Sequence, residues 1–212
     1  MHDFDVRFPR WYSAFEIAGN LIINTFLFWV ATGLIVTAPV AVTGMFAGLS
    51  GIIRPVPAET WSRFWRAARG TYGRSAILYL IDLAVVGFLW FDIRLFWGLG
   101  SIGAKLVAYF FILIAVFIAM VNLYAWPLLA WYPRPLGKVL RQAVLLTVAH
   151  PLEALAGLAV IGSGLWVILT LQQTLAFLLL LIGPAAASYA MGKAAWRVLE
   201  KYPLPEEELT FR

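Results

Sequence analysis

The chain has 212 residues, of which 62% are hydrophobic and 13% are charged, and its formal net charge is +5. Soluble domains usually carry about 25% charged residues, so this composition excludes an ordinary water-soluble domain and indicates an integral membrane protein. The sequence contains no cysteine, which excludes a disulfide framework and a thiolate metal site.

The N-terminal part of the chain begins with a short polar head and continues as one long apolar run. Residues 1–16 are mixed in charge, and the run behind them is too long for a cleavable signal peptide, so we expect a retained, extracytoplasmic head. Residues 17–53 contain no charged side chain. A straight helix of that length would be roughly 55 Å long, whereas about 20 residues cross the hydrocarbon layer. Because proline bends or ends a helix, Pro39 predicts a bent first span, with a full-depth part up to Thr37 and a half-depth part after it.

A basic and aromatic segment, residues 58–74, comes next. At ~100° per residue its aromatic side chains and most of its arginines fall on opposite faces, which predicts an amphipathic helix lying in the membrane interface. The residues assigned to this lipid or partner interface are Trp61, Arg63, Phe64, Trp65, Arg66 and Arg69. A second span is predicted at residues 75–91, and the GLGSIG sequence at residues 98–103 is a turn signal.

The third predicted span covers residues 106–131 and has Pro127 near its exit. A second basic amphipathic helix follows at residues 136–149, with Lys138 and Arg141 on its polar face. When the polar and apolar positions of the first amphipathic helix are shifted by 75 residues, they coincide with those of this second helix. That match is either a weak internal repeat or a chance similarity between two basic amphipathic helices.

The next long uncharged stretch has two glutamines near its middle. It predicts a tight hairpin of two spans at residues 154–171 and 174–191, with Pro184 in the second. Residues 193–212 begin with a third basic amphipathic segment and end in a solvated cytoplasmic tail. On this segment we expect Trp196, Leu199 and Tyr202 to face lipid.

The predicted fold is therefore an all-α, polytopic membrane helix bundle with five transmembrane helices and cytoplasmic amphipathic interfacial helices. Twelve of the 16 lysines and arginines fall on one side of this arrangement and four on the other. The positive-inside rule places the twelve in the cytoplasm, so we expect a multi-pass protein of the cytoplasmic (plasma) membrane with its N-terminus outside and its C-terminus inside. Each outward-to-inward span carries a helix-bending proline near its cytoplasmic end, at Pro39, Pro127 and Pro184.

Two segments carry a family likeness. The first is LIVTAPVAVTGMF, residues 34–46, and the second is WSRFWRAARGTYGRSAIL, residues 61–78. They resemble the first-span exit and the basic aromatic helix of the YesL family of bacterial membrane proteins, a domain of unknown function. The positions of the first segment that match are Thr37, Pro39 and Met45. Leu34 replaces the family's first proline. Family members often lie beside sugar-uptake transporter components, so the resemblance implies a role near carbohydrate import, and it supplies no established catalytic residues.

Asp82 is the sharpest candidate for a functional side chain. It lies eight residues past Arg74, hence ~12 Å beyond the predicted cytoplasmic edge. An ionisable group at that depth is costly and marks a functional site by default. Asn122 lies at a similar depth and is placed to donate a hydrogen bond to Asp82. Two interpretations stay open: a protonated Asp82 that locks two helices together, or a pathway for a solute or protons.

Other polar residues give weaker signals. Asn20 and Asn24 lie one turn apart and share a face, where helix-to-helix hydrogen bonding is favoured over a binding site. His150 and Glu153 alone do not make a metal site, since three or four ligands are needed. The sequence has no Walker loop, HExxH or GxSxG motif, so no catalytic residue, metal or cofactor is predicted.

Three functions fit these observations. The first is an accessory or carrier component associated with carbohydrate transport. The alternative is a non-transporting scaffold whose basic helices bind anionic lipid at the cytoplasmic face, transporter subunits, or copies of the same chain. A third is a lipid-modifying enzyme using His150 and Glu153. Nucleic acid is not an expected partner, because the arginines alternate with membrane-facing aromatic side chains.

Overall fold

A computed structural model describes the chain over residues 10–32, 37–53, 60–132, 134–170 and 173–201. These residues form seven helices and no strand, which confirms the predicted all-α class. The helices are α1 (Arg10–Thr32), α2 (Ala38–Ile53), α3 (Thr60–Gly98), α4 (Ile102–Trp131), α5 (Leu136–Ala149), α6 (Pro151–Thr170) and α7 (Gln173–Leu199).

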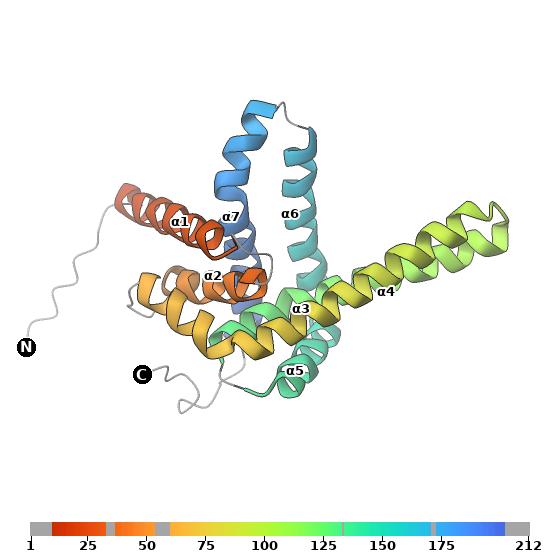
Figure 1. Ribbon diagram of the computed structural model, residues 1–212, viewed down its shortest axis with the longest axis horizontal. Helices are drawn as coiled ribbons and strands as arrows, with labels where there is room; N and C mark the ends of the chain where they lie inside the picture. The colour runs from red at the N-terminus through yellow and green to blue at the C-terminus, as the bar shows by residue number, and fades with distance from the viewer. Residues whose placement is uncertain (1–9, 33–36, 54–59, 133, 171–172, 202–212) are drawn as a thin grey trace, which may run out of the picture.

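Helix α2 lies at the centre of the molecule, with α1, α3, α4 and α7 packed around it (Figure 1). Twelve of its 16 residues are buried. At ~1.5 Å per residue it is about 24 Å long, which is shorter than the hydrocarbon layer. The apolar run that predicted one bent span at residues 17–53 is thus divided between α1 and a buried core helix. The predicted full-depth part includes residues 33–36, which lie outside the described ranges.

Pro39 begins a helix rather than bending one. It is the second residue of α2, where a missing backbone donor costs nothing because first-turn N–H groups have no partner within the helix. The described helices thus separate just before Pro39, which lies in the first turn of the second helix instead of bending a single one. Pro127 and Pro184 do lie inside helices, in α4 and α7.

The longest element is α3, which joins two segments that the sequence pattern separates. From Thr60 onward, the predicted interfacial helix 58–74 and the predicted span 75–91 form one continuous helix that runs on to Gly98, while residues 58–59 lie outside the described ranges. No proline interrupts the sequence between Thr60 and Gly98, so the change from basic to apolar side chains occurs without a break in the backbone.

Helices α3 and α4 pair as a hairpin whose far part projects from the rest of the molecule (Figure 1). We call the projecting part, residues 76–119, the arm. Its turn matches the predicted turn signal: Gly100 has a φ of 71°, which glycine adopts readily, and Ser101 caps α4 by accepting a hydrogen bond from the Ala104 backbone N–H at 3.2 Å. Helix α4 begins at Ile102, four residues before the predicted start of span three.

The C-terminal half forms a bent pair and a second hairpin. Helix α5 has the predicted bounds 136–149, and α6 leaves it at an angle of 99°. Helix α7 continues through the boundary predicted near residue 192 to Leu199, so the last span and the third basic segment form one helix. The α6–α7 hairpin projects in a different direction from the arm (Figure 1).

Among the described residues, three helices are long and apolar enough to cross a membrane. These are the Phe15–Thr32 part of α1, helix α3 and helix α4. A fourth span results if the bent α5–α6 pair is counted as one. These helices fit a multi-pass membrane protein, and the five-span arrangement stays a prediction.

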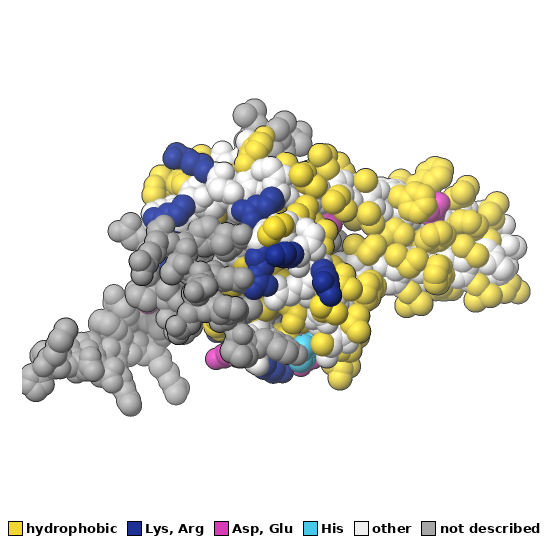
Figure 2. All heavy atoms as spheres, turned by 90° about the horizontal axis from the view of Figure 1, so that it is seen from below, with side chains coloured by type: hydrophobic (Ala, Val, Ile, Leu, Met, Phe, Trp, Pro, Cys, Tyr) yellow, Lys and Arg dark blue, Asp and Glu magenta, His cyan; other side chains and the backbone are white. Residues whose placement is uncertain are grey.

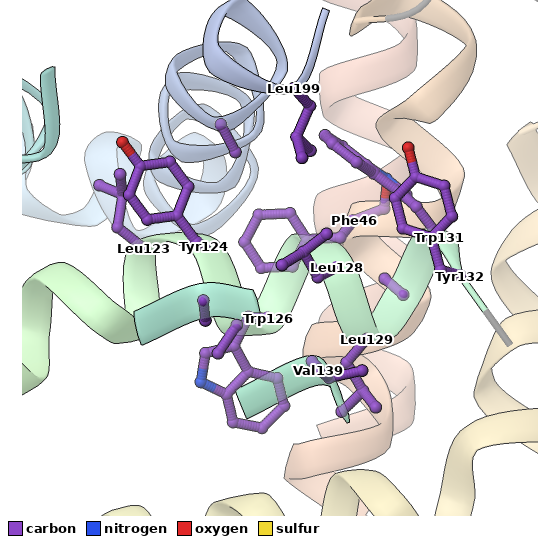
Figure 3. Close-up of a cluster of buried hydrophobic side chains, with 14 of the residues drawn as sticks. Phe46, Leu123, Tyr124, Trp126, Leu128, Leu129, Trp131, Tyr132, Val139 and Leu199 are labelled. Carbon is purple, nitrogen blue, oxygen red and sulfur yellow. The ribbon is translucent and has the colours of Figure 1, made fainter. Parts of the chain in front are cut away.

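The core lies where α2, α4, α5 and α7 meet (Figure 3). Phe46 of α2, Leu128 of α4 and Leu199 of α7 are buried in it. Trp131 donates a hydrogen bond from its indole N–H to the Phe46 carbonyl oxygen at 2.9 Å, which fixes the base of α4 against the central helix.

The amphipathic faces predicted to meet lipid are partly protein core, and that prediction is wrong for several residues. Phe64 and Leu199 are both buried. The Phe64 ring lies 3.0 Å from where a Cβ on Gly44 would stand, so the missing side chain of Gly44 provides its slot. Trp61 and Tyr72 do remain exposed. Tyr202 lies outside the described residues.

Candidate functional site

Asp82 and Asn122 are brought together across the α3–α4 seam, as their depths predicted. The Asn122 side-chain amide donates to Asp82 Oδ1 at 2.9 Å. The Trp126 indole N–H donates to Asp82 Oδ2 at 3.2 Å. Each carboxylate oxygen therefore has one donor from α4, and the two helices are linked by a pair of hydrogen bonds.

The sequence analysis missed Trp126. Its signal was available, since Trp126 lies four residues after Asn122 and so shares its helix face. In membrane proteins tryptophan is usual at headgroup level, so the residue type alone favours a position at the membrane surface. The Trp126 side chain is instead buried, with its indole nitrogen directed to the acid.

Helix spacing explains why these groups meet. Ser75, Leu78 and Asp82 recur at intervals of three and four residues, so they form one face of α3. Ser75 and Leu78 are buried, whereas Asp82 is only partly buried. Asp82 therefore lies within the arm at the edge of the α3–α4 seam, where its side chain is only partly covered.

Asn20 and Asn24 lie on α1 as predicted but face different partners. Asn20 accepts a hydrogen bond from the Thr60 hydroxyl at the start of α3. Asn24 is fully buried and donates to the Asn20 backbone carbonyl at 2.8 Å, while its Oδ1 atom has no hydrogen-bond partner among the described residues. The Thr60 contact links α1 to α3, whereas the Asn24 hydrogen bond stays within α1, and neither residue shares a hydrogen bond with Asp82 in the described part of the chain.

Three buried hydroxyl groups join α2 to α3, and the sequence analysis did not find them. Thr71 donates to Thr43, Ser75 donates to Thr71, and Thr43 and Ser75 share a hydrogen bond, each at 3.1 Å. Every member of this ring is buried. Each hydroxyl can donate only once, and each also has a backbone carbonyl of its own helix in reach: Ala67 for Thr71 at 2.7 Å, Thr71 for Ser75 at 2.9 Å and Val40 for Thr43 at 3.1 Å. The ring contacts and these backbone acceptors therefore share the three protons.

The predicted basic interface is divided between core and surface. Arg63 donates to the Ser50 hydroxyl at 2.7 Å, so its guanidinium holds α3 on α2. Arg66 and Arg69 are exposed. Trp61, Ser62, Trp65 and Arg69 line a shallow open groove on α3. The indoles of Trp61 and Trp65 meet edge to face, with ring centroids 6.1 Å apart.

Lysine and arginine side chains gather on the face of the body seen in Figure 2, while hydrophobic side chains cover most of the arm on that face. Lys138 and Arg141 are exposed on α5. Arg74 donates to the Arg134 carbonyl at 2.7 Å, and Arg134 donates to Gln142 at 2.6 Å. These last two arginines therefore join α3 to the start of α5.

His150 and Glu153 are 3.4 Å apart at the α5–α6 bend, and Lys201 reaches the same Glu153 oxygen at 3.4 Å. Glu153 and Lys201 are substantially exposed. Within the described ranges, no three His, Cys, Asp or Glu residues are grouped to hold a metal ion. The arrangement ties the end of α7 to the bend.

The chain was compared with protein-family models, curated proteins and solved structures. No protein-family model, curated protein or solved structure matches the chain.

Proposed function

We propose that this chain is an integral membrane protein that acts as an accessory component beside other membrane proteins, without carrying solute itself. The observation that carries the proposal is the arm. It is a two-helix hairpin with large apolar side chains exposed along both helices, including Leu80, Phe88, Phe110 and Leu113. Apolar surface of this extent needs lipid or a partner to cover it.

The dimensions of the arm support a transmembrane position. Arg74 and Arg94 lie 20 residues apart on α3, or ~30 Å along a helix, which equals the thickness of the hydrocarbon layer. Aromatic side chains mark the far end: Arg94 lies over the Trp90 ring at 5.1 Å, and Trp97 meets Tyr109 edge to face. Such belts occur at membrane interfaces.

The orientation we propose is the one that the charge distribution predicts. The basic body lies on the cytoplasmic side and the turn at Gly100 lies outside, because lysine and arginine are retained on the inner face. The five spans, outer N-terminus and cytoplasmic amphipathic segments predicted from the sequence also require the α6–α7 hairpin to turn parallel to the arm, since the two project in different directions (Figure 1). The membrane we assign is the bacterial plasma membrane, in line with the resemblance to the YesL family.

The bonding of Asp82 favours an accessory role over a carrier. Both of its oxygens accept hydrogen bonds from α4, as expected for a group that joins two helices. The association with carbohydrate import rests on the YesL resemblance alone. A carrier would use Asp82 differently, exchanging the Asn122 and Trp126 donors for a solute or proton during transport.

A second candidate function is anchoring to anionic lipid. Exposed Arg69, Lys138 and Arg141 lie on the body, and juxtamembrane basic residues are worth about 1 kcal/mol each near an anionic leaflet. This scaffold role is compatible with the accessory role, since both hold the protein beside other components.

Reconstitution separates an accessory protein from a carrier. The purified chain in proteoliposomes should give no uptake of radiolabelled mono- and disaccharides above protein-free liposomes. Deletion of the chain from its host should lower uptake of at least one of these sugars. Saturable uptake by the purified chain alone, lost on Asp82→Asn, would establish a carrier instead.

A further inference from the structure

Asp82 occupies a position in the arm that leaves part of its side chain uncovered. It lies eight residues from Arg74 and ten from Asp92, close to the middle of the apolar length of α3. Its sequence neighbour Ile81 and the nearby Val86 are exposed. Placing a partly exposed acid among lipid-facing side chains costs free energy, and a polar or charged partner on the exposed side of the carboxylate would lower that cost.

The carboxylate also has unused bonding capacity. Its two oxygens accept one hydrogen bond each, from Asn122 and Trp126, whereas an ionised carboxylate accepts about four. Both donors are neutral groups. They orient the acid toward the edge of the seam but do not balance its charge, which a cation at the same depth would do.

We infer that Asp82 is the recognition point for a transmembrane helix of another protein that carries one lysine or arginine near mid-depth. This inference rests on the proposed accessory function and names the chemistry of the partner. Ionisable groups inside membranes pair with one another, because pairing removes the cost of leaving each charge alone in lipid. Asn122 and Trp126 hold the acid in place for that contact.

A second copy of this chain does not supply the cation. The sequence has no lysine or arginine in residues 11–53, 75–93, 106–133 and 142–192. Every apolar stretch long enough to enter the bilayer is thus free of permanent positive charge in its interior. The complementary side chain must come from a different protein.

The test uses the full chain and a defined peptide. The chain lacks cysteine, so Ser101→Cys gives one fluorophore site at the turn. The chain is reconstituted in phosphatidylcholine liposomes with a labelled peptide of about 20 leucine and alanine residues that carries lysine at its centre. Energy transfer measures association. The central-lysine peptide should bind at least about tenfold more tightly than the same peptide with leucine at that position.

The matched control is the other acid of α3. Asp82→Asn should abolish the preference for lysine, whereas Asp92→Asn makes the same chemical change ten residues further along and should keep it. Equal binding of the lysine and leucine peptides to the unaltered chain would overturn the inference, as would a preference that survives Asp82→Asn. Transfer between two labelled copies that depends on Asp82 without peptide would also overturn it.

A second series needs no variant of the site, in case Asp82→Asn does not fold. With the unaltered chain, moving the lysine from the centre toward either end of the peptide should weaken association stepwise. Equal association at all lysine positions would contradict a mid-depth contact. If the lysine peptide shows no preference and the chain alone takes up no sugar in proteoliposomes, the inference about Asp82 is wrong but the accessory function stands. If the chain alone takes up solute, the accessory function itself is wrong.

Discussion

The side-chain amide of Asn24 in α1 lies directly against Gly48 in α2. Its Cγ atom is 3.1 Å and its Nδ2 atom 3.4 Å from the place where a Cβ on Gly48 would stand, and its Oδ1 atom is closer still. Asn24 is fully buried, and its oxygen has no conventional donor among the described residues. A Cα–H group of glycine is a weak donor that suits such a close helix crossing. This contact sets the spacing between α1 and the central helix.

Gly48→Ala should destabilise the protein by about 1–3 kcal/mol, because the added methyl group would overpack a site that Asn24 already fills. Unfolding in detergent, followed by circular dichroism, measures the change. Gly19→Ala in α1 is the matched control: no atom lies within 4 Å of its Cβ position, so the helix preference of alanine should leave stability equal or slightly higher. Adding Asn24→Ala should recover part of the Gly48→Ala loss, and full additivity would contradict the proposed clash.

Thr71→Val should cost about 1 kcal/mol, since it removes the hydroxyl that contacts both Thr43 and Ser75, while these two keep each other and their backbone acceptors. Thr147→Val is a control of equal volume change, because the Thr147 hydroxyl donates to the Ala143 carbonyl of its own helix. That control should cost less than ~0.5 kcal/mol. Comparable losses from the two variants would show that the ring adds nothing to the packing of α2 on α3.

Asn122→Leu should destabilise the α3–α4 hairpin by about 1–2 kcal/mol, because it removes one of the two donors to Asp82. In the Asp82→Leu background the same change should cost much less, since no acceptor then remains. A double-mutant cycle of thermal unfolding in detergent measures this coupling. A coupling energy near zero would show that the hydrogen bond between Asn122 and Asp82 does not stabilise the pairing of α3 and α4.

Arg63 and Arg69 should respond differently to replacement by glutamine. Arg63→Gln should lower stability by about 1 kcal/mol because its guanidinium bonds Ser50, with little change in the response to anionic lipid. Arg69→Gln should leave stability in zwitterionic lipid unchanged and reduce the extra stabilisation given by phosphatidylglycerol. The measurement is the melting temperature in nanodiscs of each lipid. Identical behaviour of the two variants would contradict this division of roles.

Properties set by local sequence were predicted well. The helical class and the turn near Gly100 follow from hydropathy and turn residues, and the Asp82–Asn122 contact follows from counting helix turns inward from each membrane edge. These quantities depend on short stretches of chain. The predicted pairing survived because both residues lie on one antiparallel hairpin.

Properties set by packing between distant segments were not predictable in the same way. A helical wheel shows that Phe64 belongs to an apolar face, but it cannot tell whether that face meets lipid or the slot at Gly44. The hydroxyl ring depends on the register of α2 against α3. Trp126 was missed because an indole N–H serves equally well at a headgroup and at a buried acid.

The central claim is that the arm crosses the bilayer, with its turn outside and the basic body inside. Single cysteines introduced at Ser101, in the turn, and at Gly70, which is exposed near the base of α3, test it in a chain that has no native cysteine. A membrane-impermeant maleimide should label Ser101→Cys in intact cells and should label Gly70→Cys only after the membrane is permeabilised. Labelling of both cysteines in intact cells, or of the turn only after permeabilisation, would contradict the account.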